Sequence, residues 1–519
     1  MSRLPPSKPD YRSLPDMPVE PHGQRIPPVP RGYRRWLLPS PNDIVFLTAF
    51  FAALALGAAL TSRDGDLGRH LRLAEWMFEN RTVPLTDVFS YTRAGSPIVA
   101  HEWLAQLVLG VAHRVAGFNG IGLLTAIMVS APWVIVSRAL LRRGVPVSAV
   151  IPLSLLGAVA SVVHWAARPH VFTFVFFAYW VIALADYEQG RRKSVYALIP
   201  LTLIWANTHG AFIVGFVLVG MYLVAALLDR HLARARHLSL VLGASIVASL
   251  ANPNGIRLIA NSFGYIGDDF LLRFTTEYNS PDFHLKGFWP FLLIVLLGVV
   301  LSLPRRNSGR ILFVGWAALA MYSFRNVPLF ALIAIPLLAE QLIATMQSHP
   351  EFLGRPRAWL AHRGEPWSEV NRTVIGGTMS LFVVLVVGLM MGPAERESPF
   401  FFRQDLFPIE TMDVLAAAPP GDRVFNQFAW GGYLLYCCWP DIEVFIDGQT
   451  DFYGPELTRE YEETFTGRAD WNEVLAAYQV DWVLIEPEAA LAQVLAESDA
   501  WVEVSRDRSA AVFVRALDS

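Results

Sequence analysis

The chain has 519 residues, of which 54% are hydrophobic and only 17% are charged. Since a typical soluble domain has about 25% charged residues, this composition favours a membrane protein. The net charge of −3, without a basic tail or stripe, argues against a nucleic-acid partner. The two cysteines, Cys437 and Cys438, are sequence neighbours, which predicts neither a disulfide framework nor a zinc site.

Residues 1–42 are rich in proline and polar residues and have no apolar periodicity, so we expect a disordered cytoplasmic tail. The tail ends in Arg31, Arg34 and Arg35, and the apolar run IVFLTAFFAALALGAAL follows at 44–60. Because the preceding tail is long and many apolar segments come later, this run is interpreted as an uncleaved first crossing rather than a secretory signal.

Ten further apolar segments have roughly the length that a helix needs to cross a bilayer, so we expect about eleven crossings within residues 43–392. They lie near residues 119–140, 147–165, 171–186, 195–207, 211–228, 238–252, 288–303, 311–324, 327–346 and 373–392. If every segment crosses, the arginine-rich connections fall on the side of the tail, and the positive-inside rule makes that side the cytoplasm. Everything after residue 393 is then expected on the outer side.

Unusual polar residues gather in the segments that this topology places outside, several of them at the ends of apolar helices. They are Asp64, Asp66, His70, His101, Glu102, Arg168, His170, Asn207, His209, Asn252, Glu277, Asp282, His284, Arg325 and Asn326. Each one alone is better explained as an interfacial anchor or a snorkelling side chain. Together, on one side, they predict a single polar pocket on the outer face, because ionisable groups at membrane depth are costly unless they face water or a partner.

The first outer loop, 61–118, has the densest cluster of ionisable groups. Its run DGDLGRHLRLAEWMF predicts an amphipathic helix that begins near Asp66, and helix capping alone accounts for one acid there. The later run HEWLAQLVLGVAHRV predicts a helix in the membrane interface with Trp103 as its anchor. The intervening VPLTDVFSYT predicts turn and extended chain.

In residues 393–519 the long apolar segments give way to short alternating strands and helices, which predict a soluble α/β domain long enough for a core of its own. Predicted strands and helices alternate through RVFNQF, GGYLLYCCW, EVFIDG, PELTREYEETF, WNEVLAAY, VDWVLIE, LAQVLAESD, WVEVS and AAVFVR. The glycines of WGGYL favour a tight strand-to-helix turn, since a P-loop would need other spacing and a lysine. Asp447 and Asp451 in IDGQTDFYG suit sugar recognition or turn formation.

Several blocks of the chain resemble a bacterial branch of the GT-C class of integral-membrane glycosyltransferases. These are DGDLGRHLRLAEWMFENRTVPLTDVFSYTRAGSPIVAHEWL, ARPHVFTF, WANTHGAFIVG and FNQFAWGGYLLYCCWPDIEVFIDGQTDFYG. The resemblance covers most of residues 43–519 and implies a GT-C-like polytopic α-helical membrane protein with a C-terminal soluble α/β domain, in the bacterial inner membrane. The branch more often has aromatic residues where this chain has Gly68 and Arg69. The local contacts and the donor preference of the branch therefore do not carry over to these two positions.

GT-C enzymes are similar in passing a sugar from a polyprenyl phosphate carrier, with inversion, to an acceptor on the outer side. The resemblance therefore implies a polyprenyl-phosphate-linked sugar and membrane lipids as partners, and a glycan, lipid or protein as acceptor. It also implies a catalytic acid at Asp64 or Asp66. Inverting transfer needs a base for the acceptor proton, for which Asp64 is the first candidate and Asp66 the second. The pair also suits a bound Mg²⁺ or Mn²⁺ that bridges to the phosphate.

The leaving lipid phosphate requires fixed cations, for which the candidates are Arg168, His170, His209 and Arg325. For His209, a helix-end hydrogen bond to the backbone is an equal alternative. Candidates for acceptor or sugar binding are His70, His101, Glu102, Asn207, Glu277, Asp282 and His284. The last three suit a solvated loop equally well.

Two other classes of protein are compatible with this composition. A secondary transporter is expected to have paired, inverted repeats, and none is detected in the sequence. A non-catalytic scaffold of an envelope assembly can retain the fold of a transferase. Single replacement of Asp64 and Asp66 by Asn distinguishes an enzyme, which loses turnover while it keeps its fold, from a scaffold, which is indifferent. A transporter would instead show substrate-dependent uptake into vesicles that lack lipid-linked sugar.

Overall fold

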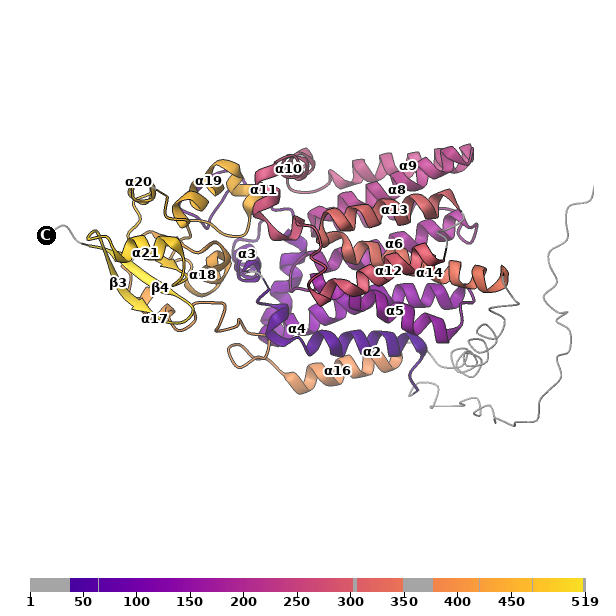
Figure 1. The fold of residues 1–519 in the computed structure, drawn as a ribbon, viewed down its shortest axis with the longest axis horizontal. Helices are drawn as coiled ribbons and strands as arrows, with labels where there is room; N and C mark the ends of the chain where they lie inside the picture. Colours follow the sequence, from indigo (N-terminus) through magenta and orange to yellow (C-terminus); the bar gives the residue numbers. More distant parts are fainter. Residues whose placement is uncertain are drawn as a thin grey trace, which may run out of the picture.

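The structure, a computed structural model, describes residues 38–63, 65–301, 306–348, 377–419, 421–468 and 470–516. A bundle of long helices forms one end of the molecule and a small α/β unit forms the other (Figure 1). Between them lie three shorter helices, α3 (Asp66–Asn80), α10 (Ile256–Ile266) and α11 (Asp269–Phe274). Most of the predicted tail and the candidate base Asp64 lie outside the described residues.

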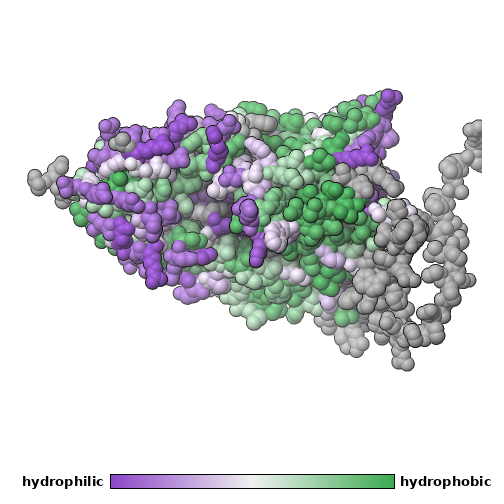
Figure 2. Space-filling model, viewed as in Figure 1, coloured by the Kyte–Doolittle hydropathy of each residue, from purple (hydrophilic) through white to green (hydrophobic). Residues whose placement is uncertain are grey.

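Each predicted apolar segment overlaps one of the bundle helices. They are α2 (Pro41–Leu54), α4 (Trp103–Arg142), α5 (Val147–Ser161), α6 (His170–Glu188), α7 (Leu198–Thr208), α8 (Ile213–Leu228), α9 (Leu232–Ser249), α12 (Trp289–Val300), α13 (Asn307–Tyr322), α14 (Val327–Ser348) and α16 (Thr378–Met391). On the face that Figure 2 shows, apolar residues cover the middle of the bundle, whereas the α/β end is mostly hydrophilic. This distribution is the one expected of a helical membrane protein with a polar domain outside the bilayer.

Length and hydropathy single out five helical segments of the described chain as able to cross a membrane. These are Trp103–Arg142, Val147–His164, His170–Glu188, Gly210–Leu228 and Phe324–Ser348. Shorter apolar helices are Pro41–Leu54, Leu198–Thr208, Lys286–Val300 and Thr378–Met391. The membrane character is thus supported, and the number of eleven crossings stays a prediction.

Helix α4 contains both the predicted interface helix and the predicted second crossing. Its regular geometry is interrupted at Ala116 and at Gly117, whose φ of 58° favours glycine. At this kink the backbone N–H of Phe118 donates to the carbonyl of Ala394, 2.9 Å away. The kink therefore joins the second crossing to the start of the C-terminal segment.

The C-terminal unit contains a four-stranded sheet of order β1-β2-β4-β3. Strand β1 (Val424–Asn426) is parallel to β2 (Trp482–Ile485), whereas β4 (Ala511–Arg515) is antiparallel to both β2 and β3 (Trp501–Arg506). Its helices are α17 (Met412–Leu415), α18 (Gly431–Cys438), α19 (Thr450–Phe465), α20 (Trp471–Ala477) and α21 (Ala490–Ala496). Buried side chains from both sheet and helices form a local apolar core.

The segment EVFIDG, at 443–448, forms isolated β-bridges at Val444 rather than a strand. The side chain of Asn426 explains this difference, because it accepts from the N–H of Phe445 at 2.9 Å and donates to the carbonyl of Ile446 at 2.8 Å. A side chain thus makes the hydrogen bonds that a neighbouring strand would otherwise make.

Helices α3 and α18 pack at very close range through glycines. A methyl group on Gly432 would lie 2.0 Å from the carbonyl oxygen of Gly65, and one on Gly68 would lie 2.2 Å from that of Gly432. The prediction that the WGGYL glycines form a strand-to-helix turn is wrong, since both lie within α18, where Gly431 has a helical φ of −53°. They allow two helix backbones to touch.

We predict that Gly432→Ala destabilises the protein by about 1–3 kcal/mol, because the added methyl forces two packed backbones apart. The measurement is the midpoint of thermal unfolding of the detergent-purified protein. The matched control is Gly243→Ala in α9, where a methyl group meets nothing within 4 Å and alanine favours the helix. An unchanged midpoint for Gly432→Ala beside an unchanged or higher one for Gly243→Ala would contradict this packing.

Candidate active site

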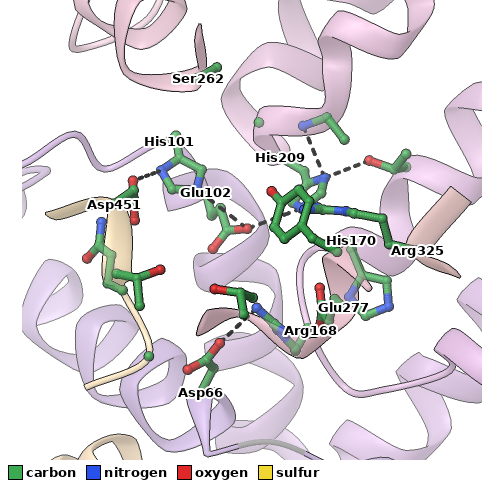
Figure 3. Close-up of a pocket in the computed structure, with 18 of the residues that line it drawn as sticks. Asp66, His101, Glu102, Arg168, His170, His209, Ser262, Glu277, Arg325 and Asp451 are labelled. Atoms are coloured by element: carbon green, nitrogen blue, oxygen red, sulfur yellow. Dashed lines mark hydrogen bonds and ion pairs between the residues drawn. The ribbon is translucent and has the colours of Figure 1, made fainter. Parts of the chain in front are cut away.

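A cavity of about 440 Å³ lies where the bundle, the first loop and the α/β unit meet (Figure 3). Segments far apart in the sequence line it: α3, the turn before α4, the start of α6, the α10–α11 region and the stretch 448–451. Ten of the polar residues expected to form one pocket lie in its wall: Asp66, His70, His101, Glu102, Arg168, His170, His209, Glu277, Arg325 and Asn326. The expected gathering of polar residues in one pocket is therefore present among the described residues.

One arginine joins two carboxylates across the floor of this cavity. Arg168, in the turn before α6, lies 2.8 Å from Asp66 and 2.6 Å from Glu277. Burial raises the pKa of Asp66, and the positive charge of Arg168 opposes this rise. Burial also favours a higher pKa for Glu277, but the positive charges of Arg168 and Arg325 outweigh this effect, and the pKa of Glu277 is lowered. Asp66 is thus the carboxyl of this pair that is tuned toward proton uptake.

Arg325 brings a second guanidinium to the cavity. It lies in the short helix η6 (Phe324–Asn326) between α13 and α14, and its guanidinium carbon is 4.5 Å from the ring centroid of Tyr278. A cation–π contact with an aromatic face holds a guanidinium in one orientation. Such a group suits an anionic oxygen of a ligand.

His209 is held in one tautomer by the end of α7. Its Nδ1 accepts from the backbone N–H of Ala211 at 3.3 Å and lies 2.9 Å from the hydroxyl of Thr173, which itself accepts from the indole of Trp205. This hydrogen-bond pattern assigns the proton to Nε2, which lies 3.4 Å from Glu102. Burial lowers the pKa of His209, so the ring is neutral. His209 therefore makes the helix-end bond and also presents a donor to the cavity.

Glu102 lies at the centre of three imidazoles. His209 is joined by His101, whose Nε2 is 3.8 Å from Oε1, and by His70, whose Nδ1 is 3.8 Å from Oε2. Gln106 lies 3.0 Å from the same Nδ1 of His70. Burial raises the pKa of Glu102 and lowers that of His70. This cluster provides donors and acceptors that a hydroxyl-rich ligand can use.

The α/β unit supplies the wall opposite this cluster. Asp451 accepts a hydrogen bond of 2.7 Å from Asn261 of α10 and lies 3.9 Å from Nδ1 of His101 (Figure 3). Beneath it, Arg69 of α3 forms a 3.0 Å ion pair with Asp447. Asp451 and Asp447 had turn formation as an equal explanation, and Asn261 had no signal in the sequence beyond an amphipathic pattern. The fold, rather than a local motif, brings Asp451 and Asn261 to the cavity and Asp447 to Arg69.

Four described residues of the predicted set do not line the cavity. Asn252 donates to the carbonyls of Ser249 and Gly255 in its own turn. Asn207 accepts from the indole of Trp103 at 2.8 Å and donates to the carbonyl of Ala251 at 3.0 Å, so it links neighbouring segments of the bundle. Asp282 and His284 are exposed, and the Asp282 carboxylate accepts from the backbone N–H of His284. The interpretation of Asp282 and His284 as parts of a solvated loop agrees with their positions.

The predicted metal site has no complete set of ligands in the described part of the chain. There, no three His, Cys, Asp or Glu side chains are arranged to hold one ion. The Asp66 carboxylate contacts Arg168, and the facing nitrogen of His209 carries a proton. These groups do not fit a metal as they stand, and the role of Asp64 in such a site lies outside the described residues.

Comparisons with known proteins identify the fold. No family model and no curated protein matches the sequence. The oligosaccharyltransferase AglB from Archaeoglobus fulgidus, in complex with an inhibitory peptide and a dolichol phosphate, is similar in structure, with a TM-score of 0.53 and 11% identity over 88% of this chain and 70% of AglB. The apo form of the oligosaccharyltransferase from this organism has a TM-score of 0.52 and 10% identity over 86% of this chain and 70% of its own.

ArnT from Cupriavidus metallidurans, bound to undecaprenyl phosphate, matches at 16% identity over 91% of this chain and 97% of ArnT, with a TM-score of 0.49. At these identities the likeness concerns the fold. The arrangement of an apolar helical bundle, a polar cavity at one end of it and a C-terminal α/β unit agrees with the resemblance of the sequence blocks. The chain therefore has the fold of AglB, which is the GT-C fold that the sequence blocks predicted.

Proposed function

We propose that the protein is an inverting glycosyltransferase that moves a sugar from a polyprenyl-phosphate donor to an envelope or lipid-linked acceptor. The observation that carries this proposal is the cavity in which Asp66, Arg168, Glu277 and Arg325 meet at the polar end of an apolar bundle. A lipid-linked sugar has an apolar chain and a charged head, and this boundary suits both. The dolichol phosphate in AglB, which shares the fold, supports a lipid-linked donor.

The proposed location is the bacterial inner membrane, with the N-terminus in the cytoplasm and the α/β unit on the outer side. Arginine-rich turns such as Arg142–Arg143 and Arg191–Arg192 follow the ends of α4 and α6. The cavity adjoins the opposite ends of these helices, since Glu102 precedes α4 and His170 begins α6. The positive-inside rule then directs the cavity to the outer face.

In the proposed reaction, the acceptor hydroxyl oxygen attacks the anomeric carbon of the donor sugar. Asp66 takes the proton of this hydroxyl as the new C–O bond forms. The bond between the anomeric carbon and the phosphate oxygen breaks on the opposite face, so the configuration inverts and polyprenyl phosphate leaves with the bonding electrons. Asp64 is the alternative base, because both acids belong to the same short segment.

The proposed donor-phosphate contacts are Arg325 and Arg168, with the Nε2–H of His209 as a neutral donor. Charge on the leaving phosphate grows in the transition state, and preorganised cations in a partly buried cavity stabilise it strongly. His170 also lines the cavity as a candidate. The cluster of His101, Glu102 and Asp451 is proposed to bind hydroxyl groups of the acceptor or sugar, beside His70 and Glu277.

The experiment that tests the function is mass spectrometry of lipid-linked sugars and surface glycans from cells with and without the gene. Cells without it are expected to accumulate a prenyl-linked sugar and to lack one glycan modification. Unchanged profiles of both classes of molecule would overturn the proposal. The mass of the accumulated species would name the sugar.

We predict that Asp66→Asn lowers turnover roughly 10²–10⁴-fold, as expected for the loss of a general base. The measurement is sugar transfer in proteoliposomes, with circular dichroism to verify the fold. Asp282→Asn is the control, since its carboxylate is exposed and lies away from the cavity. If Asp64→Asn abolishes transfer while Asp66→Asn retains it, the assignment of the base to Asp66 is wrong.

We predict that transfer rises with pH through an apparent pKa above that of an ordinary aspartic acid. Asp66 acts as the ionised base, and burial raises its pKa against the charges of Arg168 and Arg69, with Asp447 and Glu277 adding repulsion. Glu277→Gln removes one negative charge and is expected to move the acid limb to lower pH. The measurement is kcat/KM against pH. A limb that stays in place in Glu277→Gln would contradict this coupling.

We predict that Arg325→Gln weakens the binding of undecaprenyl phosphate about 10- to 100-fold. This loss corresponds to one charge-assisted hydrogen bond, about 1.5–3 kcal/mol. Binding is measured by native mass spectrometry of the detergent-purified protein. The matched control, Arg273→Gln, removes an exposed arginine of α11 whose Nε donates to the carbonyl of Asp269. Equal affinities of the two variants would remove Arg325 from the phosphate site.

A further inference from the structure

The segment 447–451 of the α/β unit lies directly against the first turn of α3, where the candidate base is found. Gly448, Gln449 and Asp451 line the cavity together with Asp66 and Arg69. The two segments are separated by nearly the whole helical bundle in the sequence, and only the fold brings them together. Their contacts are of two kinds, one electrostatic and one steric.

The electrostatic contact is an ion pair between Arg69 and Asp447. The Nε of Arg69 lies 3.0 Å from the carboxylate, and the exposed fractions of the two side chains are 6% and 2%. Arg69 also donates to the side-chain oxygen of Gln449, while Asp447 accepts from the backbone N–H of Gln449 at 2.9 Å. Removing one partner of such a buried pair leaves the other charge without compensation. The pair therefore fixes α3 relative to this segment.

Arg69 and Asp66 lie three residues apart on α3, so they share one face of the helix. A contact that holds Arg69 also restricts the rotation of α3, and with it the direction in which the Asp66 side chain leaves the helix. The charge of Asp447 also acts on Asp66, as a repulsion that Arg69 partly cancels. Asp447 consequently influences the candidate base through position and through charge.

The steric contact concerns Gly448. A methyl group on this glycine would lie 1.6 Å from Oδ1 of Asp66 and 2.6 Å from its carboxyl carbon. Contacts below 3.0 Å do not occur between real atoms of this kind, so either the carboxylate or the segment has to move. Because Gly448 has no side chain, the Asp66 carboxylate lies in the space that a larger residue at this position would occupy.

We propose that Asp447 and Gly448 are positioning residues for the Asp66 carboxylate, so that the α/β unit completes the catalytic site. Asp447 holds Arg69 on the face of α3 that Asp66 shares, and Gly448 leaves room for the carboxylate beside Arg168. The inference rests on the proposed function, because it takes Asp66 as the base. It assigns the C-terminal unit a part in turnover beyond packing or attachment.

The variant Gly448→Ala tests whether the space beside residue 448 is needed for the position of the Asp66 carboxylate. Full-length protein in proteoliposomes is supplied with the prenyl-linked lipid fraction of cells that lack the gene, and with their envelope fraction as acceptor. At a saturating amount of extract we expect turnover to fall roughly 10²-fold, because a displacement of about 1 Å at a reacting group has this effect. Undecaprenyl phosphate binding, measured by native mass spectrometry, is expected to be unchanged. Wild-type turnover in this variant would overturn the role of Gly448.

Asp447→Asn tests the charge with a side chain of the same size. The charged groups that face Asp66 are Arg168, Glu277, Arg69 and Asp447 itself, from four different segments. Removing the negative charge of Asp447 leaves Arg69 uncompensated beside the base. The acid limb of the pH profile is therefore expected to move to lower pH. A limb at the wild-type position would overturn the role of Asp447.

The control is Asp507→Asn in the same unit, which removes a carboxylate that accepts from Thr411 and from the backbone of Ala510 away from the cavity. It is expected to change neither turnover nor the pH profile. A purely structural role of Asp447 and Gly448 would make all three variants alike in these readouts, and that result would overturn the proposal.

Amide hydrogen exchange of residues 65–72 separates this inference from the proposed function. Faster exchange there in Gly448→Ala and Asp447→Asn, but not in Asp507→Asn, supports the positioning of α3 whatever the identity of the base. Wild-type exchange in both variants overturns it. Full turnover of Asp66→Asn would instead overturn the catalytic assignment, while the exchange data would still decide whether segment 447–451 positions α3.

Discussion

The close approach of α3 and α18 is the constraint on which the rest of the structure depends. Gly65 and Gly68 on one helix meet Gly432 on the other at distances that allow no side chain. This contact brings the α/β unit against the first loop, and so brings segment 448–451 to the cavity that the bundle opens at its polar end. Backbone packing thus decides which charged groups meet.

Paired charges make that meeting energetically acceptable. The two arginines beside the proposed base each pair with a carboxylate, Arg168 with Asp66 and Glu277, and Arg69 with Asp447. A buried ion pair adds little net stability, yet loss of one partner is strongly destabilising. The arrangement therefore acts mainly on geometry. It orients carboxylates and guanidiniums in advance, which is what a transfer reaction with a charged leaving group requires.

The sequence was most informative where a residue type conflicts with its surroundings. Arg168 and His209 stand out beside apolar helices, and Glu102 begins one. Their common location could therefore be predicted from the free-energy cost of ionisable groups at membrane depth alone. The glycines of α18 could not be interpreted in this way, because their contact lies more than 360 residues away and glycine carries no periodic signal. Asp451 likewise had a sufficient local explanation as a turn residue. Side chains whose partners are distant in sequence are the part that required the fold.

The ion pair between Arg69 and Asp447 links residues 378 positions apart. A ribosome finishes the first of these long before it begins the second, and chains fold as they are made. The cavity consequently lacks one wall until residues 448–451 have been synthesised. Shorter nascent chains would then lack the partner of Arg69, so the order of synthesis itself delays completion of the cavity.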